Sequence, residues 1–89
     1  MVKIYQLKEE HFDKAFMRYS KVMEAYGEPD MDWYDQVYEM EENHSLEDLF
    51  YIFNMQIPED FKGHSLSVSD IVDIDGHTFY CDVFGWKVI

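Results

Sequence analysis

The chain has 89 residues, of which 47% are hydrophobic and 18% aromatic, and its formal net charge is −12. This length predicts one domain, residues 1–89, with a single modest core, and it excludes a second lobe that could close over a substrate. No apolar run approaches the roughly 18 residues of a membrane span, and the start of the chain lacks an apolar secretory region. A single cysteine, Cys81, excludes an internal disulfide framework. We therefore expect a cytoplasmic protein.

The negative charge is concentrated in the middle of the chain. Twelve acidic residues lie between Val22 and Phe61, a segment that contains no lysine or arginine. The remaining segments hold seven acidic and seven basic residues, so their charges cancel. Such a field repels phosphate groups, and we expect no direct binding to nucleic acid or to an anionic membrane surface. The same field favours a basic protein surface as the partner.

The first part of the chain predicts a strand and a helix. Residues 2–7 favour a strand because they are rich in β-branched and aromatic side chains. Residues 15–19 fit either a helix that begins near Glu9 or a short extended segment. A helix is then expected from Ser20, as N-cap, to about Tyr26, with Gly27 as its stop.

The middle of the chain predicts a second strand and the clearest helix. Residues 33–40 alternate, and the more apolar set should point inward. That set consists of Tyr34, Gln36, Tyr38 and Met40. Ser45 opens a helix as N-cap, with Asp48 three residues further on, and Asn54 and Pro58 end this helix. An apolar stripe on the helix must be buried, and it comprises Leu46, Leu49, Phe50 and Phe53.

The last part of the chain predicts a hairpin and a final strand. Asp75–Gly76 separates two β-rich runs, residues 71–74 and 77–83, which is a strong hairpin signal. Residues 84–89 follow as a strand in which Gly85 marks a bulge or a close approach of backbones. The sum is an α+β fold, with a small, mainly antiparallel sheet and one or two short helices packed on one face.

The segment from Phe61 to Val72, with the sequence FKGHSLSVSDIV, joins the helical pattern to the hairpin. It resembles the signature of the YodL-like domain, a small module in proteins of Gram-positive gut bacteria, conjugative elements and phages. Segments that match this family in order and spacing are Tyr5–Leu7, Tyr34–Tyr38, Leu46–Asn54, Tyr80–Asp82 and Phe84–Trp86, although Trp86 stands where the family pattern has Phe. The resemblance covers nearly the whole chain. It implies a fold, a strand over residues 15–19 and a mobile-element setting, but no reaction, ligand or catalytic residue.

The signature segment also contains residue types that occur in catalytic sites. Within seven residues it holds His64, Ser65, Ser67, Ser69 and Asp70. Catalytic triads are assembled from separated parts of a fold and need an oxyanion site. We therefore interpret the serines and Asp70 as side chains that bind backbone groups in a turn, and Gly63 as a residue with a positive backbone angle. A small enzyme centred on His64 and Asp70 is an alternative.

No metal site and no cofactor are expected. His77 and Cys81 would share a face of a strand, but at this spacing they lie about 13 Å apart, which is too far for two ligands of one ion. Cys81 is therefore interpreted as a small core residue.

The favoured hypothesis is a non-catalytic protein-interaction module, a monomer or weak dimer, that docks through an acidic and aromatic surface. Its candidate interaction residues are Trp33, Tyr51, Glu39, Glu41, Glu42, Glu47 and Asp48. A DNA mimic that inhibits a nucleic-acid-binding defence enzyme is the alternative, because a dozen acids on one flank could imitate phosphates.

Overall fold

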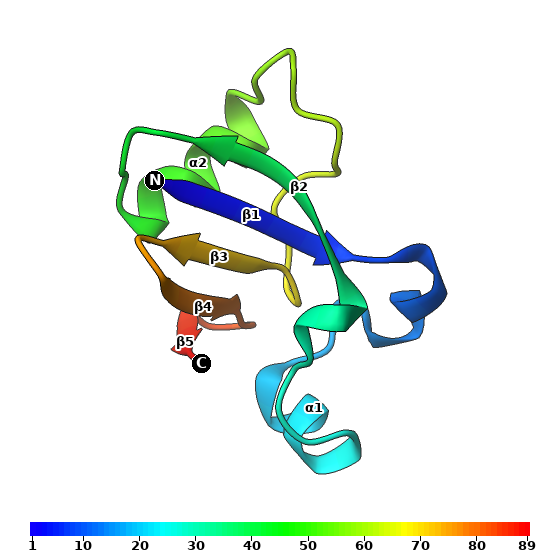
Figure 1. Cartoon of the computed structure of the whole chain (residues 1–89). Helices are drawn as coiled ribbons and strands as arrows, with labels where there is room; N and C mark the ends of the chain where they lie inside the picture. The colour runs from blue at the N-terminus through cyan, green and yellow to red at the C-terminus, as the bar shows by residue number, and fades with distance from the viewer.

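The computed structural model describes residues 1–89 as a five-stranded antiparallel sheet with two α-helices and two short 3-10 helices (Figure 1). The strands are β1 (Val2–Leu7), β2 (Tyr34–Met40), β3 (Ile71–Ile74), β4 (His77–Cys81) and β5 (Trp86–Val88). The helices are α1 (Tyr19–Ala25), α2 (Leu46–Met55) and the short 3-10 helices η1 (Glu9–Lys14) and η2 (Met31–Trp33). The strand order is β2-β1-β3-β4-β5. The predicted α+β class is confirmed.

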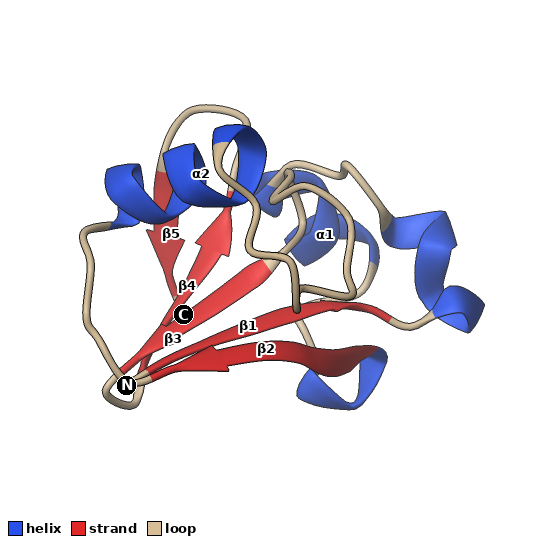
Figure 2. Cartoon of the chain, turned by 90° about the horizontal axis from the view of Figure 1, so that it is seen from above, coloured by secondary structure: helices blue, strands red, loops and turns tan.

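Buried side chains form two clusters, one on each face of the sheet. The first cluster consists of Val2, Ile4, Leu49, Phe53, Phe61, Leu66 and Val72, and α2 covers it (Figure 2). The second consists of Leu7, Val22, Tyr34, Ile71 and Tyr80, and α1 contributes Val22 to it. Successive residues of a strand face opposite sides, so Ile71 and Val72, both 0% exposed, place apolar groups on both faces. The longer helix α2 packs on one face of the sheet, as predicted, and α1 adds Val22 to the cluster on the other face.

The strand predicted over residues 33–40 forms as β2, but its alternation is interrupted. Ile4 of β1 pairs with Tyr38 and the next residue pairs with Gln36, which leaves Val37 between them as a bulge. Because of this extra residue, the alternation of side chains between the two faces of the sheet changes phase at the bulge. Tyr38 packs against the α2 cluster, whereas Tyr34 belongs to the other cluster. The predicted single inward set was therefore wrong.

The strand expected over residues 15–19 does not form. Residues 9–14 fold as η1, and Phe16 then has a φ of 62°, which turns the chain in a way that a strand does not allow. Both neighbours of β1 are already taken by β2 and β3. The helix α1 begins at Tyr19, so Ser20 lies in its first turn and is not the N-cap, while Gly27, with a φ of 85°, ends it as predicted.

The helix α2 begins as predicted, but its buried face differs from the predicted stripe. Ser45 caps it, because the Ser45 hydroxyl accepts a hydrogen bond from the Asp48 amide at 3.1 Å. Leu49 and Phe53 are fully buried, whereas Phe50 is 43% exposed. The prediction that Phe50 is buried was wrong, since the helix is rotated so that Ile52 packs against the core.

The predicted hairpin is confirmed as β3 and β4. Asp75 and Gly76 have φ values of 52° and 89°, as a two-residue turn with the twist of a hairpin requires. Gly85 marks neither a bulge nor a close approach, because no atom lies within 4 Å of where its Cβ would be. It has a φ of 76° in a turn closed by the Asp82 amide and the Gly85 carbonyl, and β5 begins one residue later. Neither α-helix has the length and apolar character that crossing a membrane requires.

Candidate functional site

The signature segment folds as a loop that Gln6 of β1 fixes to the sheet. The Gln6 side-chain amide donates to the His64 carbonyl at 2.8 Å and to Asp70 Oδ2 at 3.1 Å. Its oxygen accepts from the His64 amide at 3.1 Å. Gln6 is only 3% exposed, so these bonds satisfy an amide that burial would otherwise destabilise. One side chain therefore positions both candidate catalytic residues.

Gly63 provides the space for this amide. A Cβ at this position would lie 2.2 Å from Gln6 Oε1, closer than real Cβ contacts. The expected positive backbone angle was wrong for Gly63 and occurs instead at Ser69, with a φ of 88°. Two hydrogen bonds hold Ser69 in this strained conformation. Its amide donates to the Cys81 carbonyl, and the Tyr34 hydroxyl donates to the Ser69 carbonyl.

Asp70 is a buried carboxyl group at the centre of the loop, with 1% exposure. Its Oδ2 accepts from the Ser67 amide at 2.8 Å and from Gln6 at 3.1 Å. Burial raises the pKa of Asp70 to about 7, although these bonds and the nearby His64 ring act in the opposite direction. The bond from the Ser67 amide agrees with the turn role inferred for Asp70.

The His64 ring directs both nitrogens at groups of its own loop. Its Nδ1 lies 2.7 Å from the Ser65 carbonyl, which can only accept, so Nδ1 carries a proton. Its Nε2 lies 3.8 Å from Asp70 Oδ1. Ser67 Oγ also donates to the Ser65 carbonyl, at 2.7 Å. With Phe12, Ala15 and Phe16, the half-exposed His64 ring lines a hollow of about 270 Å³.

A second group of candidates lies on the outward side of α2, which we call the α2 surface. It consists of Glu47, Asp48, Phe50 and Tyr51, all exposed. Phe50 and Tyr51 are 43% and 54% exposed. Sequence reasoning selected three of these four residues and missed Phe50, because the helical stripe placed it in the core.

The other predicted interaction residues do not join the α2 surface. Trp33 is half-buried, with Lys14 Nζ 4.9 Å from its ring centroid and Tyr26 against its edge. Glu39 lies opposite Lys3 in the register of β1 and β2, and it faces away from α2. The last two candidates lie in the exposed connection between β2 and α2, and they are Glu41 and Glu42.

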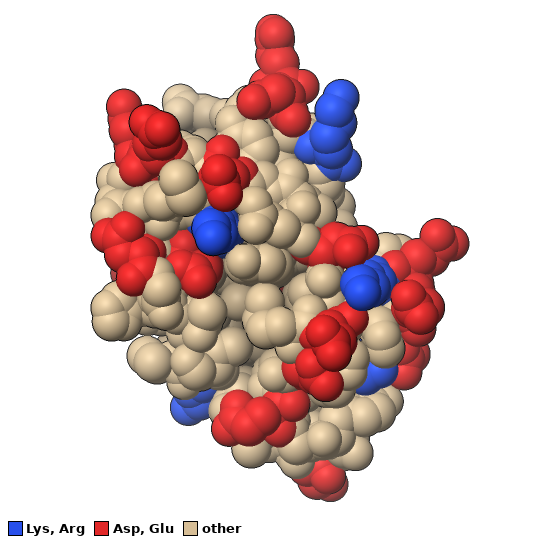
Figure 3. Space-filling model, viewed as in Figure 1, with Lys and Arg blue, Asp and Glu red and all other residues tan.

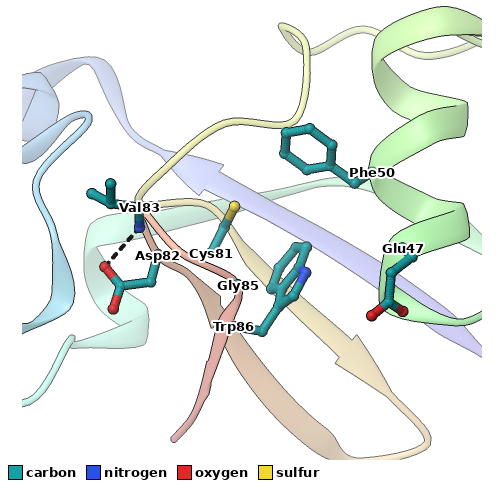
Figure 4. A pocket seen from close by; sticks show the side chains of 7 residues that line it. All are labelled: Glu47, Phe50, Cys81, Asp82, Val83, Gly85 and Trp86. Atoms are coloured by element: carbon teal, nitrogen blue, oxygen red, sulfur yellow. Dashed lines mark hydrogen bonds between the residues drawn. The ribbon is translucent and has the colours of Figure 1, made fainter.

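A hollow of about 390 Å³ adjoins the α2 surface, and we call it the α2–β5 hollow (Figure 4). Its lining residues are Glu47, Phe50, Cys81, Asp82, Val83, Gly85 and Trp86. Phe50 reaches into it from α2 and Trp86 from β5, with Cys81 beside the space between the two rings (Figure 4). The sequence gives no signal for this hollow, because its walls come from segments more than 30 residues apart.

The two carboxylates that line the hollow differ in their hydrogen bonding. Asp82 Oδ1 accepts from the Tyr19 amide at 3.0 Å and from the Val83 amide at 2.8 Å, so it is engaged by the backbone. The side-chain carboxylate of Glu47 makes no hydrogen bond or ion pair, and it lies on the Trp86 side of the hollow (Figure 4). Burial raises the pKa of the Cys81 thiol to about 12, so this thiol is neutral. No three His, Cys, Asp or Glu side chains come together as metal ligands.

These features define a small α+β domain with a polar loop fixed to its central strand and an aromatic, acidic helix surface. The family model of the YodL-like domain matches residues 1–89, and the chain belongs to this family. The resemblance carried by the signature segment is thereby confirmed. The chain matches no curated protein and no solved structure.

Proposed function

We propose that the chain is a non-catalytic protein-interaction module, of mobile-element or phage origin, that docks on a basic protein surface through the α2 surface. The observation that supports this proposal most directly is the juxtaposition of exposed Phe50 and Tyr51 with Glu47 and Asp48 on one side of a helix. Aromatic anchors with polar neighbours are typical of protein interfaces. The net charge of −12 favours a basic partner by steering its approach.

The arrangement of the acids gives less support to a DNA mimic. Mimicry needs carboxylates in ordered rows, because B-DNA presents one charge per roughly 1.7 Å of its axis. On the face drawn in Figure 3, Asp and Glu side chains lie in several separate groups, and Lys or Arg side chains lie beside some of them. This pattern is typical of a solvated acidic surface with local docking sites.

The geometry of His64 supports a role in the structure of the loop. A general acid or base needs a nitrogen that reaches the substrate. Here Nδ1 lies 2.7 Å from the Ser65 carbonyl and Nε2 lies 3.8 Å from Asp70 Oδ1, so both nitrogens lie close to groups of the loop itself. We therefore leave the enzyme centred on His64 and Asp70 outside the proposal.

The proposal is tested with the full chain and three peptides of equal length, one basic, one neutral and one acidic. We expect binding of the basic peptide alone, and a steep loss of affinity between about 50 and 300 mM salt, because screening shortens the range of the field. Tyr51→Ala should weaken binding. Phe12→Ala is the matched control, since both side chains are 54% exposed. Equal binding of the three peptides, or equal effects of the two substitutions, would contradict the proposal.

A further inference from the structure

We propose that the α2–β5 hollow binds one arginine side chain of the partner, stacked between Phe50 and Trp86 with its guanidinium group on Glu47. This inference rests on the proposed function and deepens it, because it names the side chain that the basic partner inserts. The hollow adjoins the α2 surface through Glu47 and Phe50, which belong to both. Docking on the helix would therefore bring a partner side chain to its mouth.

The walls of the hollow suit a planar cation. Phe50 and Trp86 approach from separate elements and leave an open space between their rings (Figure 4). A guanidinium group is planar, weakly hydrated and stacks on aromatic faces, whereas an ammonium group is a compact and strongly hydrated charge. Cys81, which is 3% exposed and neutral, adds an apolar contact to the wall of the hollow.

The charge of the hollow is negative and uncompensated. Glu47 has no partner, and no lysine or arginine lines the hollow. The closest basic residue in sequence is Lys87, but it pairs with Tyr80 across β4 and β5 and lies over the ring of Tyr19, 5.9 Å from its centroid. That position is on the opposite face of the sheet. A free carboxylate beside two aromatic rings is a suitable site for a forked, charge-assisted contact with arginine.

The rim of the hollow predicts the residue next to this arginine. Val83 is 42% exposed and Phe84 is 93% exposed, and both lie in the turn between β4 and β5. Solvated apolar side chains beside a binding site favour an apolar neighbour in the ligand. The expected recognition element is therefore an arginine with an adjacent leucine or similar side chain.

The test is a titration of the full chain with a Gly/Ser peptide that carries one Arg-Leu pair, followed by two-dimensional NMR. Peptides with lysine or citrulline in place of the arginine are the matched controls, since citrulline keeps the shape of arginine without its charge. We expect the indole N–H signal of Trp86 to shift and that of Trp33 to stay in place. The lysine and citrulline peptides should bind about fivefold and tenfold more weakly.

Two substitutions locate the contact. Phe50→Ala, at an exposed position, and Glu47→Gln should each weaken binding of the arginine peptide about fivefold to tenfold. Asp48→Asn, which makes the same charge change one residue away, should weaken binding less than about twofold. Arginine binding in the hollow would be contradicted if basic peptides bound without moving the Trp86 signal, or if the citrulline peptide bound as well as the arginine peptide. The proposed docking function would not be affected by either result. The absence of binding to any basic peptide would overturn both proposals.

Discussion

Asp70 is a buried carboxyl group with three polar neighbours. The Ser67 amide and the Gln6 amide both donate to Oδ2, and the His64 ring faces Oδ1. Because His64 Nδ1 faces the Ser65 carbonyl, the other ring nitrogen, Nε2, is the one that faces Asp70, 3.8 Å from Oδ1. The loop conformation and the protonation of Asp70 are therefore linked.

The raised pKa of Asp70 predicts a pH-dependent stability with a defined sign. The folded chain keeps a proton on Asp70 up to about pH 7, whereas the unfolded chain releases it near pH 4. The folded state thus binds more protons in this interval, so the free energy of unfolding falls as pH rises from about 4 to about 7. Asp70→Asn should remove this fall, as measured by urea unfolding at several pH values. The control is Asp35→Asn, at an exposed position. Identical pH profiles of Asp70→Asn and the unsubstituted chain would contradict this prediction.

The contact between Gly63 and Gln6 predicts strong coupling between the two positions. Gly63→Ala should lower the free energy of unfolding by about 1–3 kcal/mol, because a methyl group 2.2 Å from Oε1 displaces an amide that holds Asp70 and His64. In a chain that already carries Gln6→Ala, the same substitution should cost much less, since the obstructing atom is gone. Denaturant unfolding of the four variants in the cycle measures this coupling. Additive costs would show that Gly63 serves another purpose.

At the scale of the element, α2 has one buried face and one exposed face, and we propose that the exposed face docks on the partner. Phe53 is 0% exposed and packs on Tyr38 and Phe61 with ring centroids 5.4 and 5.0 Å apart. Phe50, three residues earlier, is 43% exposed. The same residue type thus stabilises the core at one position and is free to contact a partner at the other.

This division predicts opposite outcomes for two identical substitutions. Phe53→Ala should lower the free energy of unfolding by about 3–5 kcal/mol, because it removes a fully buried ring. Phe50→Ala should change it by less than about 1 kcal/mol while weakening binding of a basic peptide. Thermal unfolding and a binding titration on the same samples separate the two effects. A large loss of stability from Phe50→Ala would contradict the assignment of this residue to the docking face.

Local signals predicted the elements that depend on neighbouring residues. The Asp75–Gly76 turn and the Ser45 cap are encoded within a few positions, and both form as predicted. The bulge at Val37 and the turn at Phe16 depend on how β1 is paired, which is a property of the whole sheet. The rotation of α2 is also set by packing, and it exposed a phenylalanine that periodicity alone places inside.

At the scale of the whole molecule, the sequence predicted the acidic segment but not which of its residues lie together on the surface. Glu47 and Tyr51 were selected because they are acidic or aromatic in an acidic segment, and both are exposed. The hollow was not predictable, since Phe50, Cys81 and Trp86 meet only when β5 pairs with β4 beside α2. Trp33 shows the converse, because an aromatic in the acidic segment is used for packing against Lys14 and Tyr26.

The net charge predicts opposite effects of salt on folding and on binding. A chain with a charge of −12 repels itself when folded, so salt should raise its melting temperature by screening that repulsion. The same screening should weaken its affinity for a basic peptide. Thermal unfolding and binding are measured over one salt series, with sodium chloride as the only variable. Affinity that is independent of salt would assign docking to the aromatic side chains alone.

The most direct measurement of the proposed docking function is a map of backbone amide shifts when an arginine-rich peptide is added to the full chain. We predict that the shifts centre on residues 47–51 and 83–86, where the α2 surface meets the α2–β5 hollow. Amides of the His64 loop and of Trp33 should stay in place. Shifts spread over all the acidic residues, or centred on the hollow beside Phe12 and His64, would contradict docking through α2.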